Sequence, residues 1–296
     1  SKIMDENNIC FVCGSKATIK HYAEPVMYFC SCPVCGRYEY YPVFGELTDF
    51  DLNHLGSYLA YNGFKESNNE YRYFTTMSKE RCDEYRRDFA QGNVTNGHPV
   101  RLEKENVENW YPKTFAERVD YILLYLDSKI PHMGEYIKLK KEELFSCFFV
   151  ERYDYVDGQY KRLADTLLKN QMDYMRCYLR EQQLIRTPDS WNGSEYDRPI
   201  TITPNGYARI DSLQKNTTNG KNVLVAMKFG DDTKKLREAI RQGISEAGYI
   251  AILIDEVEHN DFITPELLKY IRDSKFVVVD LSHHNNGAYF EEGYAM

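Results

Sequence analysis

Two carboxylates near the end of the chain have the spacing and surroundings of a reactive pair. Asp280 ends the apolar run that starts at Phe276, and such a β-branched run is typical of a buried parallel strand. A short Asn/Gly turn follows, and the next helix carries Glu291 near its first turn. Ligands of open α/β sheets bind outside the carboxyl ends of the strands, so both carboxylates are expected at one rim.

A carboxylate at such a rim can attack an electron-poor carbon or stabilise a developing positive charge, while a second positions hydroxyl groups or moves a proton. We therefore predict Glu291 and Asp280 as catalytic residues. Two alternatives stay open: Asp280 can cap the turn that follows its strand, and Glu291 can stabilise a helix N-terminus. The neighbouring Glu292 is expected to point into solvent.

Loops after the other strands of the same region can reach this rim. Gly230 follows the strand expected at 223–227, where main-chain amides would meet a phosphate or ribose. The alternative, equally favoured, is that Gly230 only marks the turn after the strand. His259 is a candidate to protonate a leaving base, but a lone histidine in a loop is more often a surface residue. The residues predicted to bind substrate are Phe229, Gly230, Asp255, His259, Asn260, Asn286 and Tyr289.

Four cysteines near the N-terminus have the spacing of a structural metal site. Cys10 and Cys13 form one C-x2-C pair, and Cys32 and Cys35 form another. Each pair is typical of a tight turn, here called a knuckle, that aims two thiolates at one ion. Glycine follows each pair, where a knuckle favours positive φ. All four positions would be filled, so we predict structural Zn²⁺; a redox pair or disulfides are the poorer alternatives.

The elements that must position the carboxylates alternate between strand and helix. Strands are expected at 223–227, 249–254 and 276–281, with a helix from an Asp231-Asp232 cap to Gly248 between the first two. Thr264 and Pro265 are expected to open a further helix before the last strand. This order predicts right-handed crossovers and a doubly wound parallel sheet.

The middle of the chain reads as mostly helical. Apolar residues repeat at helical spacing from Leu52 and from Val119, and again between Leu163 and Leu179. Two short strands around 184–185 and 200–203 flank a polar excursion, which after a helix is typical of a winged helix. Basic side chains on this helix are interleaved with acidic ones, so a protein-interaction or spacer role competes with DNA contact. The basic positions are Lys161, Arg162, Lys169, Arg176 and Arg180.

Composition limits the broad class of protein. The net charge of −8 argues against a protein that coats nucleic acid by charge alone. A hydrophobic content of 43% over 296 residues is enough for two or three domains with real cores. No segment has the length of apolar sequence that a membrane span needs, and we expect a cytoplasmic protein with no membrane partner.

The C-terminal segment, over about residues 222–296, resembles the nucleoside 2-deoxyribosyltransferase-like superfamily. The segments that carry the resemblance are Val225-Ala-Met-Lys-Phe-Gly230, Glu246-Ala-Gly-Tyr249, Asp255-Glu-Val-Glu-His-Asn260 and the stretch from Phe276 to Met296. The resemblance implies that Glu291 attacks the anomeric carbon of a sugar and displaces a base. It further implies a homo-oligomer, because sites of this superfamily are often completed by a neighbouring subunit. The family fold continues beyond the position of Glu291, so a truncated or abbreviated domain is expected.

The predicted fold class is a multidomain α/β protein. Its parts are a zinc ribbon (1–45), a helical region (46–150), a winged-helix-like region (151–216) and a deoxyribosyltransferase-like domain with a doubly wound parallel sheet (217–296). The resemblance implies an N-glycosidase for NAD or another nucleotide-type molecule, acting as a regulated effector of bacterial antiphage defence. The alternatives are a nucleotide-sensing module without catalysis, and a DNA-binding regulator; the N-terminal modules could bind a protein or nucleic acid.

Overall fold

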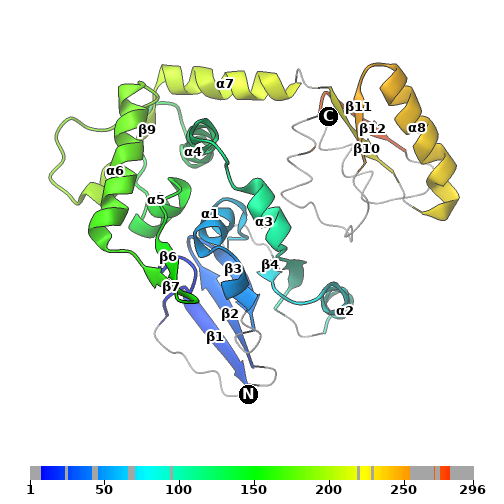
Figure 1. The fold of residues 1–296 in the computed structure, drawn as a ribbon, viewed down its shortest axis with the longest axis horizontal. Helices are drawn as coiled ribbons and strands as arrows, with labels where there is room; N and C mark the ends of the chain where they lie inside the picture. Colours follow the sequence, from blue (N-terminus) through cyan, green and yellow to red (C-terminus); the bar gives the residue numbers. More distant parts are fainter. Residues whose placement is uncertain are drawn as a thin grey trace. The chain divides into compact units, whose positions relative to one another are not determined.

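The chain forms two compact units, Ser1–Tyr207 and Ala208–Met296. Figure 1 labels the helices and strands of both units. The computed structural model describes residues 8–23, 26–41, 46–65, 71–93, 96–218, 221–227, 230–253, 270 and 274–280.

A five-stranded mixed sheet organises the N-terminal unit. Its strands, in spatial order, are β1 (Thr18–Ala23), β2 (Val26–Cys32), β3 (Gly36–Tyr40), β4 (Arg72–Thr75) and β5 (His98–Arg101). Strand β2 pairs antiparallel with both β1 and β3, whereas β3, β4 and β5 run parallel to one another. The strands that follow the cysteine pairs therefore belong to a larger sheet that extends to Arg101.

The two faces of this sheet carry separate cores, because neighbouring side chains of a strand point to opposite faces. On one face Tyr38 packs with the four cysteines and with α1 (Leu52–Asn62). On the other face Met27 and Tyr41 pack with Cys82 of α2 (Lys79–Ala90). Tyr38 faces the cysteines, so its neighbour Glu39 points to the opposite face, where it is fully buried.

Short helices complete this unit around the cysteine-bearing face. They are α3 (Lys104–Trp110), α4 (Phe115–Lys129) and α5 (Lys141–Cys147). The predicted helical spacing from Leu52 and from Val119 is confirmed by α1 and α4. Thr114 and Glu117 form a capping box at the start of α4, which satisfies two main-chain amides. A hairpin of β6 (Tyr153–Val156) and β7 (Gln159–Arg162) follows α5.

The predicted helix and hairpin of the winged-helix-like region are present. Helix α6 (Asp165–Glu181) precedes β8 (Ile185–Arg186), which pairs antiparallel with β9 (Thr201–Ile202). Thr203-Pro204 is typical of a helix start, and the Thr203 hydroxyl accepts a hydrogen bond from the Gly206 amide at 3.1 Å, as a cap does.

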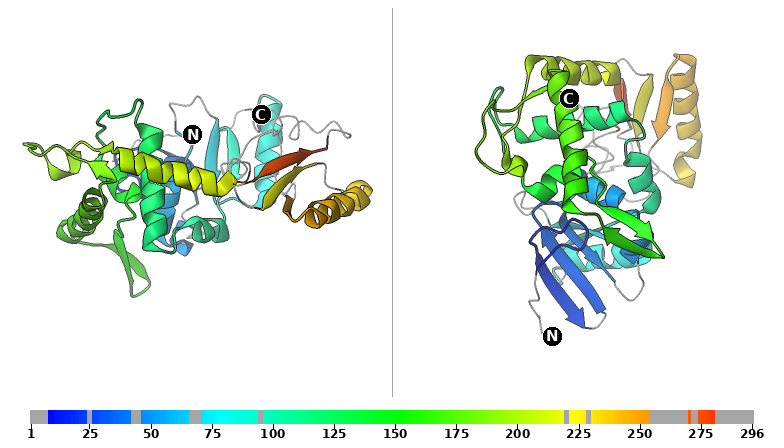
Figure 2. Two further views of the ribbon diagram at one scale, coloured as in Figure 1. Left: turned by 90° about the horizontal axis from the view of Figure 1, so that it is seen from above. Right: turned by 60° about the vertical axis from the view of Figure 1, so that its left-hand side comes forward.

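The polar composition of 214–222 predicts a linker from the sequence, and this prediction is wrong over 214–218. Helix α7 (Pro204–Thr218) continues through these residues and is a single rod in Figure 2. Once the cap has nucleated the helix, each further residue adds one hydrogen bond, and Gln and Lys are good helix formers. The polar composition of the segment therefore does not stop the helix.

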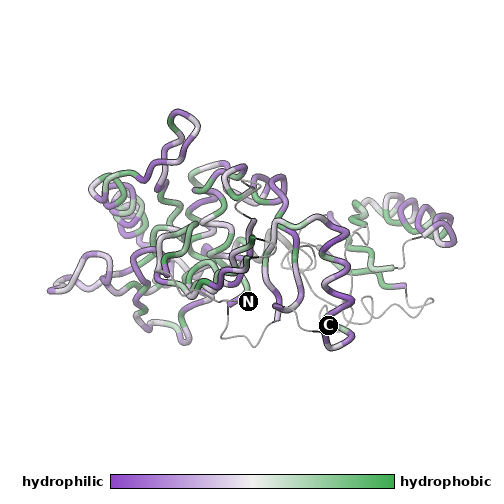
Figure 3. Tube along the Cα trace, turned by 90° about the horizontal axis from the view of Figure 1, so that it is seen from below, coloured by the Kyte–Doolittle hydropathy of each residue, from purple (hydrophilic) through white to green (hydrophobic). Residues whose placement is uncertain are grey.

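Beyond the end of α7, the described part of the C-terminal unit is mainly a small parallel sheet and helix α8. Strands β10 (Asn222–Ala226), β11 (Ile250–Leu253) and β12 (Phe276–Val279) lie in the order β11-β10-β12. Both pairings are parallel, as the alternating pattern predicts. Helix α8 (Lys234–Glu246) packs Ile244 on β10, and Figure 3 shows both hydrophilic (purple) and hydrophobic (green) positions along it. Gly248 ends this helix segment at φ +82°.

Candidate functional sites

The order of the parallel strands marks one edge as the place for a ligand. Strand β10 is central, with β11 on one side and β12 on the other. The chain passes from β10 to β11 on one side and continues to β12 on the other side of β10, so the carboxyl ends of β10 and β12 flank a topological switch point. The Asp280 amide donates to the Ala226 carbonyl at 2.8 Å, and this bond fixes Asp280 at that edge. Its side chain is half-buried.

Gly230 follows β10 at the same edge but has a structural task. Its carbonyl accepts hydrogen bonds from the Thr233 amide at 3.2 Å and from the Thr233 hydroxyl at 3.1 Å. Its backbone is extended, with φ 175°, so no left-handed conformation requires glycine here. Asp231 and Asp232 lie in a 3-10 turn over Asp231–Thr233, and no side chain caps α8. The predicted Asp231-Asp232 helix cap is therefore wrong.

The remaining residues predicted for this site lie outside the described residues. Their roles stay predictions from the sequence, and so does the helix expected after Thr264. These residues are Phe229, Asp255, His259, Asn260, Asn286, Tyr289 and Glu291.

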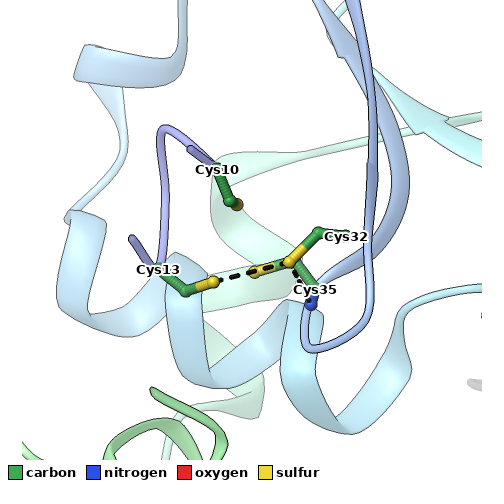
Figure 4. A group of neighbouring side chains, drawn as sticks. All are labelled: Cys10, Cys13, Cys32 and Cys35. Carbon is green, nitrogen blue, oxygen red and sulfur yellow. Dashed lines mark hydrogen bonds between the residues drawn. The ribbon is translucent and has the colours of Figure 1, made fainter. Parts of the chain in front are cut away.

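The four N-terminal cysteines come together as their spacing predicts. The sulfur atoms of Cys10, Cys13, Cys32 and Cys35 all lie within 4.8 Å of one another, and all four residues are buried (Figure 4). A tetrahedral zinc site with Zn–S bonds of about 2.3 Å has sulfur atoms about 3.8 Å apart, so the cluster has the size of such a site. The donor set fits Zn²⁺.

Main-chain geometry holds both knuckles. The Cys32 sulfur accepts from the Val34 amide at 3.4 Å and from the Cys35 amide at 3.3 Å, and the Cys13 sulfur accepts from the Ser15 amide at 3.5 Å. Gly14 and Gly36 have φ of +80° and +76°, so the predicted need for positive φ is confirmed. These amide donors favour thiolates over thiols.

Burial and mutual hydrogen bonds shift the thiol pKa values in opposite directions. Burial is the largest cause that raises the pKa of Cys10, whereas a hydrogen bond with Cys10 is the first cause that lowers the pKa of Cys13. Hydrogen bonding with Cys10 also leads the causes that raise the pKa of Cys32 and Cys35. Four thiolates in one buried place therefore need a cation, and a bound divalent metal ion supplies it.

Helix α1 lies directly against the second knuckle. A Cβ atom at Gly63 would lie 2.0 Å from the Cys35 carbonyl oxygen, and one at Gly36 would lie 2.7 Å from the main chain of Phe64. The Arg37 amide donates to the Phe64 carbonyl at 2.9 Å. The two glycines permit this close approach, so the cysteine centre shares one core with α1.

Basic residues of the winged-helix-like region are largely held by acidic partners. The Arg176 side chain is 5% exposed and donates to Glu195 Oε2 at 2.9 Å and Asp173 Oδ1 at 2.6 Å. Lys169 also pairs with Asp173, and Arg162 pairs with Glu142 at 3.2 Å. The interpretation as a mixed charged face is confirmed, and Arg176 is not presented to a nucleic acid.

Comparisons with known proteins give no relative for this chain, since no family model, curated protein or solved structure matches it. Among the helices of the described residues, none is long and apolar enough to cross a membrane.

Proposed function

We propose that the unit Ala208–Met296 cleaves the bond between base and sugar in a nucleotide-type molecule. The observation that carries this proposal is Asp280 at the switch point of the parallel sheet, hydrogen-bonded to the end of the central strand. Open parallel sheets bind their ligands at this place. The resemblance of 222–296 to the deoxyribosyltransferase-like superfamily supports the choice of reaction.

In the proposed reaction the Glu291 carboxylate attacks the anomeric carbon as the carbon–nitrogen bond to the base breaks. The bond's electron pair leaves with the base: a nucleobase takes a proton from His259 or from solvent, whereas the nicotinamide of NAD leaves neutral and needs no proton. Water then hydrolyses the glycosyl ester and regenerates the carboxylate. Asp280 would hold the ribose hydroxyl groups during both steps.

The cysteine centre has a structural role in this proposal. Four protein sulfur atoms complete a tetrahedral zinc site and leave no open position for substrate or water. The N-terminal unit would then serve as the regulatory part that binds a protein or nucleic acid. A homo-oligomeric effector of antiphage defence is the biological role that the superfamily resemblance favours.

The test is base release measured by chromatography after incubation of the full chain with NAD and a panel of nucleotides and nucleosides. We expect release by the unaltered chain, and a loss of at least about 100-fold in Glu291→Gln and Asp280→Asn. Glu238→Gln, an exposed position in the middle of α8, is the matched control and should keep full activity.

Equal base release by all three variants would overturn the proposed roles of both carboxylates. Calorimetric titration with the same panel separates the sensing alternative. Nucleotide binding that is weakened by Asp280→Asn, with no release of base from any substrate, would identify a sensing module in place of an enzyme.

A further inference from the structure

A metal ion held by four cysteines creates an electrostatic problem. Zn²⁺ bound to four thiolates has a net charge of −2, and the four cysteines are between 0% and 3% exposed. A buried charge is stable only where nearby positive charges or hydrogen bonds compensate it. The main-chain donors to Cys13 and Cys32 supply part of this compensation. Two cationic side chains beside the knuckles can supply the rest.

Lys65 is the cation at the second knuckle. Its amino group donates to the carbonyl of Val34, which lies between Cys32 and Cys35, and to the Leu59 carbonyl at 3.3 Å. Among the described residues no carboxylate forms an ion pair with Lys65. Both identified acceptors are neutral main-chain oxygens, so neither of them neutralises the positive charge of the amino group beside the sulfur atoms.

Arg152 is the cation at the first knuckle. It is fully buried, and its guanidinium donates to Ser146 Oγ at 2.9 Å and to the Glu142 carbonyl at 3.3 Å. A Cβ atom at Gly56 would lie 2.3 Å from Arg152 Nη2 and 3.6 Å from Val12 Cγ1. The guanidinium therefore occupies the space that glycine leaves on α1, beside the residue that precedes Cys13.

The carboxylate next to Arg152 does not cancel its charge at the knuckle. Glu142 Oε2 lies 3.8 Å from Arg152 Nη1, whereas Glu142 Oε1 lies 3.2 Å from the nearer Arg162. Glu142 is thus shared by two arginines, and Arg162 has a second carboxylate, Asp165, at 3.8 Å. Because Glu142 Oε2 forms no hydrogen bond with Arg152, the charge of Arg152 is only partly balanced beside Cys13. The hydroxyl of Tyr153 donates to the Val12 carbonyl at 3.2 Å, which ties this knuckle to the strand after Arg152.

We propose that Lys65 and Arg152 compensate the charge of the metal-bound thiolates, one at each knuckle, and thereby set the affinity of the centre for zinc. Both are positioning residues that lie outside the segment 1–45 predicted as a ribbon. Metal binding is consequently coupled to the end of α1 and to the junction before β6. This inference depends on the metal assignment and is independent of the proposed glycosidase reaction.

The test measures the zinc dissociation constant of the full chain by competition with a chromogenic chelator. Removing a residue that supports the metal ligands typically weakens metal binding about 10- to 100-fold. We expect the zinc affinities of Lys65→Gln and Arg152→Gln to fall by a factor in that range. Lys65→Arg should restore most of the affinity because it keeps the charge.

Two control variants separate charge compensation from general loss of structure. Lys16 is exposed but lines the same cavity of about 1020 Å³ as Lys65, so Lys16→Gln removes a charge near the knuckles without removing a knuckle contact. Arg176 is a buried arginine with its own carboxylate partners, so Arg176→Gln disturbs the fold away from the centre. We expect both controls to retain the zinc affinity of the unaltered chain.

A second measurement compares the thermal midpoints of metal-loaded and chelator-treated protein. Compensation predicts that the gap between the two midpoints narrows in Lys65→Gln, whereas a purely structural role lowers both midpoints together. Should Arg152→Gln not fold, Arg152→Lys and Lys65→Gln decide the question. A zinc affinity of Lys65→Gln equal to that of Lys16→Gln, with an unchanged gap, would overturn the proposal.

Discussion

The two candidate sites differ in how deeply the fold contains them. The cysteine centre lies in the core of the N-terminal unit, where its knuckles share buried contacts with α1 and with the five-stranded sheet. Asp280 lies half-buried at the end of a strand of the C-terminal unit, where open sheets receive ligands. A site inside a core contributes to the free energy of folding, whereas a site at a sheet edge can bind ligands or catalyse a reaction with little effect on folding. Changes in the first should therefore affect folding, and changes in the second should affect only function.

The strongest test of this difference changes one residue in each site. We expect Cys32→Ser to lower the thermal midpoint of the N-terminal unit to about that of the chelator-treated protein, since structural zinc contributes about 10 kcal/mol or more to folding in small zinc domains. Asp280→Asn should leave the unfolding of the C-terminal unit within about 1 kcal/mol of its original free energy. Limited proteolysis, with fragments identified by mass spectrometry, reports the two units separately.

Chelation of the metal is the matching experiment without mutation. It should expose cleavage sites across α1 and the five-stranded sheet, because the cysteines share their core. Cleavage confined to the predicted ribbon segment 1–45, with α1, β4 and β5 protected, would show that the knuckles form an independent ribbon, and the comparison would fail.

What the sequence could and could not predict follows from the range of each interaction. The cysteine cluster and the positive φ of Gly14 and Gly36 were predictable because they depend on residues close in the chain. The parallel order of β10, β11 and β12 was predictable because short crossovers leave few topologies.

The surroundings of the metal centre were not predictable from local pattern. Lys65 and Arg152 reach the knuckles from distant segments, and no spacing in the sequence predicts these contacts. One signal was available: α1 contains Gly56 in its interior, where helix propensity disfavours glycine, and such a residue indicates close approach by another group. The continuation of the cysteine-bearing strands into β4 and β5 likewise depends on long-range pairing.

A buried carboxylate of the N-terminal unit extends the comparison to pH. Glu39 is fully buried and accepts a hydrogen bond from Thr75 Oγ1 at 2.8 Å. Burial raises its pKa from 4.5 to about 7, against the lowering effects of Thr75, Asn96 and Arg81. A raised pKa means that the stability from protonated Glu39 is fully present below pH 4.5 and is lost as pH rises through 7. The loss corresponds to about 3 kcal/mol.

Urea denaturation of Glu39→Gln across this pH range tests the argument. The variant should lose the decline in stability of the N-terminal unit between pH 5 and 8, because a neutral amide keeps one protonation state. Glu105→Gln, at an exposed position of α3, should keep the decline. An unchanged pH profile in Glu39→Gln would show that Glu39 does not carry the effect.

The smallest effects compare two glycines inside helices, one in each unit. A Cβ atom at Gly56 of α1 would lie 2.3 Å from Arg152 Nη2, so Gly56→Ala must displace a buried guanidinium, and we expect a loss of about 1–3 kcal/mol. Gly243 of α8 has nothing within 4 Å of its Cβ position, and there Gly243→Ala should stabilise by about 0.5–1 kcal/mol. Urea denaturation of the two variants measures both free energies of unfolding.

The opposite signs carry the test, since the two substitutions are chemically identical and both positions are helical. If both variants gained stability, the space beside Gly56 would have to be open, and Arg152 could not lie against α1 next to Val12. If Gly56→Ala lost stability only in metal-loaded protein, the guanidinium would be held there by the charge of the centre. A loss that persists after chelation would indicate that packing alone holds Arg152 in place, and the coupling between metal and α1 would then be steric.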